Sequence, residues 1–372
     1  MNALVDVCAQ FVSLNEFRAM VQLYGEHITL LGKGEPGMGK SSQLTAMAVE
    51  NGDKWRQTGD YCPDDKYRYV YIDCTNEEIN DRKMNMPRHD TQSIAVYLSN
   101  EFHLDDGRPL YLMIDEYAKG PRALQTTWLR LMLERVIGDR KLPKGSKVFA
   151  TCNHTADGVG DKIEPHAGNR LMIVPIRKSN AMEYLAYIGQ RIPVVLRGWV
   201  AANKRCLASY LEAGQTDNEY IFNPTRSGNV SFVSPRSLTA AGFVVENRDK
   251  VPAHVLEAAL SGLVGKAAAK SMVATFALDK QLPSFKEVIA DPTGIEMPED
   301  PVAQILMMVR GADSVEIQDD LSAFMQFVDR VKNKEIQQIF FSQVVAQSRT
   351  VLLVRGNQRL TKWRIDNWEY MA

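Results

Sequence analysis

In the first half of the chain, short apolar runs alternate with longer segments of helical spacing. Apolar, β-prone runs predict strands at residues 28–31, 69–73, 110–114, 147–151 and 171–174. The spacing of apolar side chains predicts helices at residues 15–24, 41–49, 92–102 and 121–136. The five consecutive apolar residues at 110–114 are typical of a parallel strand that is buried on both faces. The pattern therefore predicts an α/β core with a parallel sheet, in which the polar residues 77–90 form an insertion or mobile loop.

After Lys178 the pattern becomes mostly helical. Helices are predicted at residues 181–191, 193–204, 207–213, 255–278 and in a segment that starts near residue 234. Prolines break residues 282–300 into a linker with a short helix, and amphipathic stripes resume between residues 321 and 344. We therefore expect an α/β core over residues 1–178, a helical domain over 179–280 and a helical C-terminal extension over 281–372.

Composition and charge narrow the classes of partner. Of the 372 residues, 45% are hydrophobic, and 44 Lys and Arg nearly balance 45 Asp and Glu, so no global field attracts nucleic acid or an anionic membrane. Five scattered cysteines without a C-x-x-C pair indicate a reducing compartment with free thiols and argue against a structural zinc site. No apolar run approaches a membrane span and the N-terminus does not resemble a signal peptide, so we expect a cytoplasmic protein.

The clearest chemical motif fits the phosphate-binding pattern G-x-x-x-x-G-K-[ST] at every fixed position. The predicted nucleotide-binding residues are Gly34, Glu35, Pro36, Gly37, Met38, Gly39, Lys40, Ser41 and the following Ser42. Lys40 would place its charge against the β- and γ-phosphates, and the Ser41 hydroxyl is a hard oxygen ligand suited to Mg²⁺. A predicted strand precedes the loop and a predicted helix follows it. This arrangement points the N-terminus of the helix at a bound anion. The alternative is a surface turn rich in Gly and Pro that happens to fit the pattern.

Two carboxylates, Asp115 and Glu116, follow the apolar run at residues 110–114. Open α/β sheets place their ligands at the carboxyl ends of the strands, which is where this pair is expected. Hydrolysis of a nucleoside triphosphate needs one carboxylate for Mg²⁺ and another that orients and deprotonates the attacking water. We assign the metal to Asp115 and the water to Glu116. The alternative is a solvated strand end with no chemical role.

On these two motifs the sequence resembles the AAA+ ATPases, and within them the MoxR-like, dynein-related group. The resemblance continues through residues 150–153, 168–170 and 234–236 and covers roughly residues 14–247. It implies that residues 179–280 form the helical lid of that family. It also implies that a ring of identical subunits, expected to be a hexamer, uses ATP and Mg²⁺ to remodel or assemble a partner protein or adaptor.

The resemblance also implies roles for three further residues. In the family, an Asn at the position of Asn153 helps to position the lytic water. An Arg at the position of Arg170 reaches the γ-phosphate bound by a neighbouring subunit, and the lid Arg at the position of Arg236 senses the same phosphate. One departure is that residues 74–90 contain no Phe, Tyr or Trp, whereas threading members of the family carry an aromatic pore loop there.

Two other classes of function stay open at the level of sequence. One is an ATP-dependent scaffold or switch with slow turnover, although a pure scaffold would not need Glu116. The other is a nucleic-acid motor. Near-zero net charge counts against a motor, but several basic residues could form a local basic surface: Lys83, Arg88, Arg140, Lys141, Lys144 and Lys147.

Overall fold

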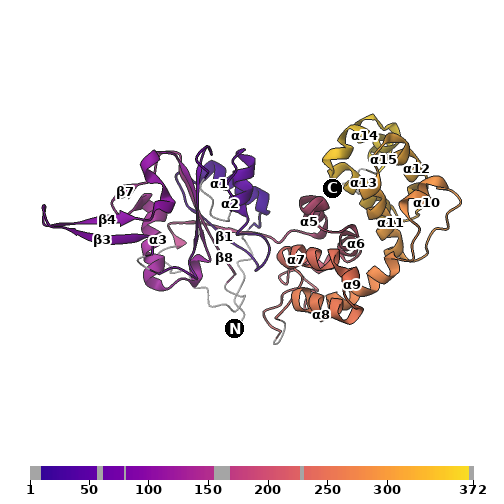
Figure 1. The fold of residues 1–372 in the computed structure, drawn as a ribbon, viewed down its shortest axis with the longest axis horizontal. Helices are drawn as coiled ribbons and strands as arrows, with labels where there is room; N and C mark the ends of the chain where they lie inside the picture. Colours follow the sequence, from indigo (N-terminus) through magenta and orange to yellow (C-terminus); the bar gives the residue numbers. More distant parts are fainter. Residues whose placement is uncertain (1–9, 57–61, 79–80, 155–167, 227–229, 368–372) are drawn as a thin grey trace. The chain divides into compact units, whose positions relative to one another are not determined.

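The computed structural model describes residues 10–56, 62–78, 81–154, 168–226 and 230–367. The chain divides into two compact units, Met1–Lys178 and Ser179–Ala372 (Figure 1). The boundary follows Lys178, where the sequence pattern changes from alternating runs to mostly helix.

The first unit is built on a parallel sheet. Within its described residues, five strands pair in the order β2-β5-β8-β1-β9, and all four pairings are parallel. The strands are β1 (Leu30–Lys33), β2 (Arg68–Asp73), β5 (Leu110–Asp115), β8 (Lys147–Cys152) and β9 (Met172–Pro175). These are the strands that the apolar runs predict, so the α/β core with a parallel sheet is confirmed.

Helices cover both faces of this sheet (Figure 1). The helices α1 (Leu14–Tyr24) and α2 (Gln43–Glu50) pack on one face, and α3 (Arg122–Glu134) packs on the other. All six residues of β5 are buried because alternate side chains point to the two faces. Tyr111 joins the core beneath α1 and α2, whereas Leu112 joins the core beneath α3. Burial on both faces explains why this strand has no polar alternation.

The prediction for residues 77–102 was wrong. Instead of a loop and a helix, the segment contains an antiparallel hairpin of β3 (Lys83–Arg88) and β4 (Ser93–Leu98), which extends away from the sheet (Figure 1). Ile94, Val96 and Leu98 recur with a period of two, which is a strand pattern, but six residues are too few to separate it from a helix. The pairing with β3 therefore decides the structure of this segment.

Small elements complete the first unit. They are the short antiparallel strands β6 (Val136–Ile137) and β7 (Arg140–Lys141) and the 3₁₀ turns η1 (Asn100–Phe102), η2 (Leu104–Asp106) and η3 (Tyr117–Lys119).

The second unit is helical and has one shared hydrophobic core, which includes residues on both sides of position 280. Its helices are α5 (Ala181–Ile188), α6 (Val194–Ala202), α7 (Pro235–Glu246), α8 (Ala253–Val264), α9 (Lys266–Asp279), α10 (Phe285–Ala290), α11 (Pro301–Ser314), α12 (Gln318–Asp329), α13 (Lys334–Ala346), α14 (Val351–Gly356) and α15 (Gln358–Asp366), with 3₁₀ turns η5 (Gly189–Arg191), η6 (Lys204–Leu207), η7 (Arg248–Lys250) and η8 (Ser348–Thr350). The predicted helical C-terminal part is therefore confirmed.

Three details of this unit differ from the sequence prediction. Leu207 ends the 3₁₀ turn η6, and residues 208–213 are not helical, because the Ser209 and Glu212 side chains accept hydrogen bonds from nearby backbone N–H groups and hold a turn. Residues 255–278 form two helices, which are separated by Gly265 at φ 86°. The helix α11 was missed because Pro301 was interpreted as a breaker, whereas it occupies the first turn after the Asp300 cap.

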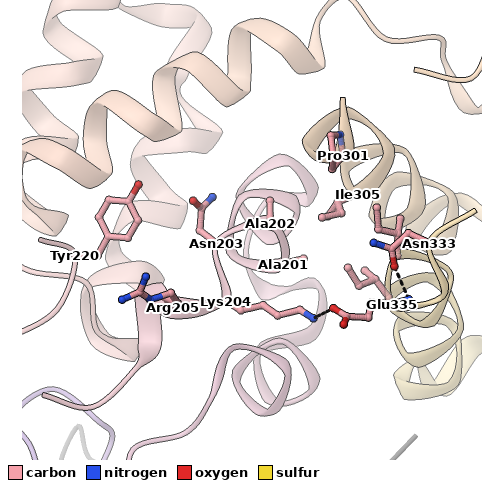
Figure 2. Close-up of a pocket in the computed structure, with 12 residues that line it drawn as sticks. Ala201, Ala202, Asn203, Lys204, Arg205, Tyr220, Pro301, Ile305, Asn333 and Glu335 are labelled. Carbon is pink, nitrogen blue, oxygen red and sulfur yellow. Dashed lines mark hydrogen bonds and ion pairs between the residues drawn. The ribbon is translucent and has the colours of Figure 1, made fainter. Parts of the chain in front are cut away.

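A pocket of about 430 Å³ lies in the second unit, between residues of α6, η6, α11 and α13 (Figure 2). Its wall is partly apolar, and Lys204 and Glu335 point toward each other with 3.3 Å between Nζ and Oε2. These opposite charges offset each other. The pocket contains none of the residues that the sequence predicts to bind nucleotide.

Two expectations from composition concern thiols and membranes. No disulfide joins the described cysteines Cys62, Cys74, Cys152 and Cys206 to one another, and all but Cys62 are buried. Among the described helices, none is long and apolar enough to cross a membrane.

Close helix packing in the second unit generates a stability prediction. A Cβ atom on Gly311 of α11 would overlap the ring of Phe324, which itself packs against Phe285, Phe327 and Phe340. Gly311→Ala should therefore lower the free energy of unfolding by about 1–3 kcal/mol, measured by urea denaturation. The matched control is Gly262→Ala on α8, where a Cβ meets no atom within 4 Å, and it should raise stability by about 0.5–1 kcal/mol. Equal effects of the two substitutions would contradict this packing.

Candidate functional site

The order of the strands brings the predicted site residues to one edge of the sheet. The strands β5, β8 and β1 are neighbours, and their carboxyl ends lie at the same edge because all are parallel. Asp115 ends β5, Asn153 follows β8 and the loop of residues 34–41 follows β1. The fold thus places the two motifs and Asn153 side by side, although they are far apart in sequence.

The loop of residues 34–41 has the conformation that its glycines permit. Gly37 has φ 74° and Gly39 has φ 105°, a region that is strained for residues with a side chain. Ser41 and Ser42 still belong to the turn, so α2 begins at Gln43 rather than at the predicted Ser41. The Ser42 hydroxyl donates to the Gly39 carbonyl at 2.8 Å and fixes the end of the loop.

The Lys40 ammonium is buried at the centre of this loop. Its Nζ donates to the Gly34 carbonyl at 2.6 Å, to the Glu35 carbonyl at 2.8 Å and to Asn153 Oδ1 at 2.9 Å. These three acceptors are uncharged oxygens, which solvate the ammonium. An anionic phosphate oxygen would be a stronger acceptor than any of them, because hydrogen bonds between charged partners are the strong ones. The site therefore fits a phosphate group.

Asp115 is 2% exposed and is held by neighbouring hydroxyl groups. Tyr71 donates to its Oδ2 at 2.9 Å, and Thr151 donates to its Oδ1, which also accepts from the backbone N–H of Glu116. Burial and the negative charge of Asp115 raise the pKa of Tyr71, so its hydroxyl keeps the proton that it donates. The Ser41 side chain lies beside the same hydroxyl. Tyr71 thus connects Ser41 and Asp115, the two residues predicted to hold Mg²⁺.

These residues fit a magnesium ion that is bound together with a phosphate. Among the described residues, no group of three or more His, Cys, Asp and Glu side chains is placed to hold a metal by itself. A hydroxyl such as that of Ser41 and one carboxylate such as Asp115 are nevertheless usual protein ligands for Mg²⁺, because phosphate oxygens and water complete its shell.

Glu116 follows Asp115 with a left-handed backbone, at φ 51° and ψ 33°. Its Oε2 accepts a hydrogen bond from Asn153 Nδ2 at 3.2 Å and lies 2.9 Å from Lys119 Nζ. Asn153 therefore contacts both Lys40 and Glu116, so a chain of direct contacts joins the loop lysine to the predicted base.

Glu35 has a structural contact that the sequence does not suggest. Its side chain is 3% exposed, and its Oε2 lies 3.9 Å from the buried ammonium of Lys178, the last residue of the first unit. The buried pair links the loop to the segment that follows β9. Glu35 therefore belongs to the loop as predicted, with its side chain engaged by the protein itself.

Within the described residues, the two predicted arginines take no part in the contacts of this cluster. Arg170 is exposed just before β9, and within the described residues its side chain makes no hydrogen bond or ion pair. Arg236 is also exposed and belongs to the second unit, in the first turn of α7, where Ser234 is the N-cap and Pro235 the first residue, as predicted. Both side chains are accessible from solvent.

Four residues around the site are not predicted from the sequence: Tyr71, Lys119, Thr151 and Lys178. Tyr71 and Thr151 reach Asp115 because β2 and β8 flank β5 in the sheet, and that order could not be deduced from the motifs. Lys119 offers a local signal, since a cation three residues after Glu116 can face it where the chain turns.

Comparisons with known proteins are weak. No family model and no curated protein matches the sequence. Similar solved structures include NtrX from Brucella abortus, with a TM-score of 0.30 and 11% identity over 90% of this chain and 68% of that chain. Another is a presumed ATPase from Cytophaga hutchinsonii, with a TM-score of 0.32 and 14% identity over 94% of this chain and 87% of that chain. Such TM-scores are too low to assign a function, which is therefore inferred from the site itself.

The imidazole of His154 reports on the electrostatics of the site. Burial, aided by the positive charges of Lys40 and Lys33, lowers the pKa of His154 from 6.5 to about 4. The histidine is therefore neutral near pH 7.

The shifted pKa of His154 predicts a pH dependence of stability. Between about pH 6.5 and 4 the unfolded chain binds a proton at this residue and the folded chain resists it, so falling pH favours unfolding. Chemical denaturation of the parent and of His154→Gln at pH 7 and pH 5 measures this contribution. The parent should lose up to about 2 kcal/mol more than the variant between these two pH values. An identical loss in both proteins would show that His154 does not carry the effect.

Proposed function

We propose that the protein binds and hydrolyses ATP at this site, as an AAA+ ATPase of the MoxR-like kind. One observation carries the proposal. Lys40, Asn153 and Glu116 form a continuous chain of contacts beside the buried Asp115, at the ends of three adjoining strands. A lysine for phosphate, a carboxylate for metal and a second carboxylate for water are the parts that phosphoryl transfer to water requires.

Each residue has a distinct part in the proposed reaction. Lys40 binds the β- and γ-phosphates, and backbone groups of residues 34–42 surround them. Ser41 and Asp115 would hold Mg²⁺, which when bound neutralises charge on the phosphate oxygens. The hydroxyls of Tyr71 and Thr151 fix the Asp115 carboxylate, so its orientation does not depend on the metal.

Glu116 is the proposed general base. It takes a proton from a water molecule while the water oxygen forms a bond to the γ-phosphorus. The bond from that phosphorus to the oxygen that bridges it to the β-phosphorus breaks, and its electron pair leaves with ADP. Asn153 holds the Glu116 carboxylate near Lys40 during this step. The presence of both carboxylates favours hydrolysis over the alternative of an ATP-dependent scaffold with slow turnover.

Assembly into a homo-oligomeric ring, a hexamer in this proposal, would give Arg170 a role. Its exposed guanidinium has no acceptor within the described residues, which is compatible with a contact to ATP on a neighbouring subunit. A guanidinium supplied by a neighbour would stabilise charge that develops on the γ-phosphate. Arg236 would sense the same phosphate from the helical lid.

The proposed ring would act on a partner protein or adaptor. The hairpin β3–β4 supports this part of the proposal, because it exposes Met84 by 61%, Ile94 by 70% and Tyr97 by 59%. Exposed apolar side chains on one projecting element are typical of a protein interaction site. Tyr97 is an aromatic residue on the returning strand, just beyond the segment in which the sequence shows none. A nucleic-acid motor is less well supported because the net charge is −1.

Substitutions of Lys40 and Glu116 separate binding from hydrolysis. Lys40→Ala removes the countercharge of the phosphates and should weaken ATP binding by roughly 100-fold, measured by isothermal titration calorimetry. Glu116→Gln keeps shape and metal contacts but loses the base, so it should bind Mg²⁺-ATP like the parent and hydrolyse it roughly 100-fold more slowly. Lys40→Ala with nearly parental affinity would show that the loop is not the site. If Glu116→Gln hydrolyses ATP as fast as the parent, Glu116 is not the general base, and Asp115 and Asp73 are the next candidates.

Mixed assemblies test whether Arg170 acts on a neighbouring subunit. Arg170→Ala should bind ATP nearly normally and hydrolyse it about 100-fold or more slowly, because charge in the transition state is not compensated. Mixing it with Lys40→Ala subunits, which lack the phosphate contact but retain Arg170, should restore part of the activity. Arg130→Ala, at an exposed arginine on α3, is the matched control and should hydrolyse ATP like the parent. If mixtures that co-assemble recover no ATPase activity, Arg170 acts on ATP bound by its own subunit or takes no part in the reaction.

A further inference from the structure

Lys119 stands at the end of a turn that begins at the predicted base. Glu116 precedes the 3₁₀ turn Tyr117–Lys119, and the backbone N–H of Lys119 donates to the Glu116 carbonyl at 2.9 Å. This turn brings the Lys119 ammonium back over Glu116, where Nζ lies 2.9 Å from Oε2. The ion pair is therefore built into the local backbone.

The Glu116 carboxylate needs such a restraint. Its backbone is left-handed, and a glutamate side chain has three rotatable bonds and is here 26% exposed. Left to itself, the carboxylate would sample several positions at the surface of the sheet edge. Two donors from different elements converge on the same oxygen instead, Asn153 Nδ2 at 3.2 Å and Lys119 Nζ at 2.9 Å. Within the part of the chain that the structure describes, the other carboxylate oxygen accepts no hydrogen bond, so a water molecule can bind there.

The restraint extends to the phosphate loop. Asn153 is buried, and its Oδ1 accepts from Lys40 Nζ at 2.9 Å while its Nδ2 donates to Glu116. Direct contacts therefore join four side chains in the order Lys40, Asn153, Glu116 and Lys119. The proposed base, Glu116, lies between Asn153 and Lys119. The Asn153 contact to Glu116 is the longest of the three, so the ion pair with Lys119 is the shorter of the two restraints on the carboxylate.

We propose that Lys119 is a positioning residue, which holds the Glu116 carboxylate in the orientation that activates water. The inference rests on the proposed ATP hydrolysis at this site. Lys119 touches neither phosphate nor metal in this account and acts only through Glu116. Because both partners of the pair are partly exposed, the pair contributes little to folding stability, whereas the orientation of a base affects rate directly.

Three variants test the role of charge and reach at position 119. Lys119→Met removes the charge and keeps much of the length, so kcat should fall about tenfold. The dissociation constant of a fluorescent ATP analogue should stay within about twofold of the parent, since Lys119 does not contact nucleotide. Lys119→Arg restores a cation and should recover most of kcat. The matched control is Arg130→Met, which removes the cation of an exposed ion pair with Glu134 and should change neither quantity.

A double substitution shows whether Lys119 acts through Glu116. In the Glu116→Gln background the base is already lost, so adding Lys119→Met should not reduce the single-turnover rate further. The inference is overturned if Lys119→Met leaves or raises kcat, if Lys119→Arg fails to restore it, or if the two substitutions lower the rate independently. A parent protein that neither binds nor hydrolyses ATP would instead overturn the proposed function, and that result is separate from these.

Discussion

The site depends on one constraint, which is that the buried Lys40 ammonium must be surrounded by oxygen atoms. Burying a charge without hydrogen bonds is costly, so the Gly34 and Glu35 carbonyls and Asn153 surround Nζ within 2.9 Å. This arrangement requires the loop to curl around its own lysine, which Gly37 and Gly39 permit through positive φ. It also requires β8 to lie beside β1, because Asn153 follows β8. The conformation of the loop and the order of the strands are thus both needed to surround the Lys40 ammonium with oxygen atoms.

The charged groups at this site are held by different partners. Lys40 donates to two carbonyl oxygens and to the Asn153 amide oxygen, and His154 stays neutral near pH 7 because burial and two nearby lysines lower its pKa. The carboxylates are placed separately: hydroxyl groups hold Asp115, and Lys119 and Asn153 hold Glu116. One carboxylate is therefore suited to a metal and the other to a proton, and this division of roles supports hydrolysis as the proposed function.

The sequence predicts those parts of the structure that local pattern determines. Long apolar runs identified the strands, and the glycine loop, Asp115 and Glu116 followed from motifs whose chemistry is local. The hairpin was missed because a two-stranded ribbon buries no full face, so its pattern is short and ambiguous. Tyr71 and Thr151 depend on which strands flank β5, and the pair of Glu35 with Lys178 joins distant segments. These contacts arise from tertiary structure and leave no pattern in the sequence.

A structure of the protein with Mg²⁺ and a slowly hydrolysed ATP analogue tests the central claim most directly. The β- and γ-phosphates should lie within hydrogen-bonding distance of Lys40 Nζ, which exchanges its present carbonyl acceptors for phosphate oxygens. The metal should lie beside Ser41 and Asp115, and Glu116 should face the γ-phosphate. A nucleotide bound elsewhere, with Lys40 still bound to the Gly34 and Glu35 carbonyls, would show that this loop is not the phosphate site.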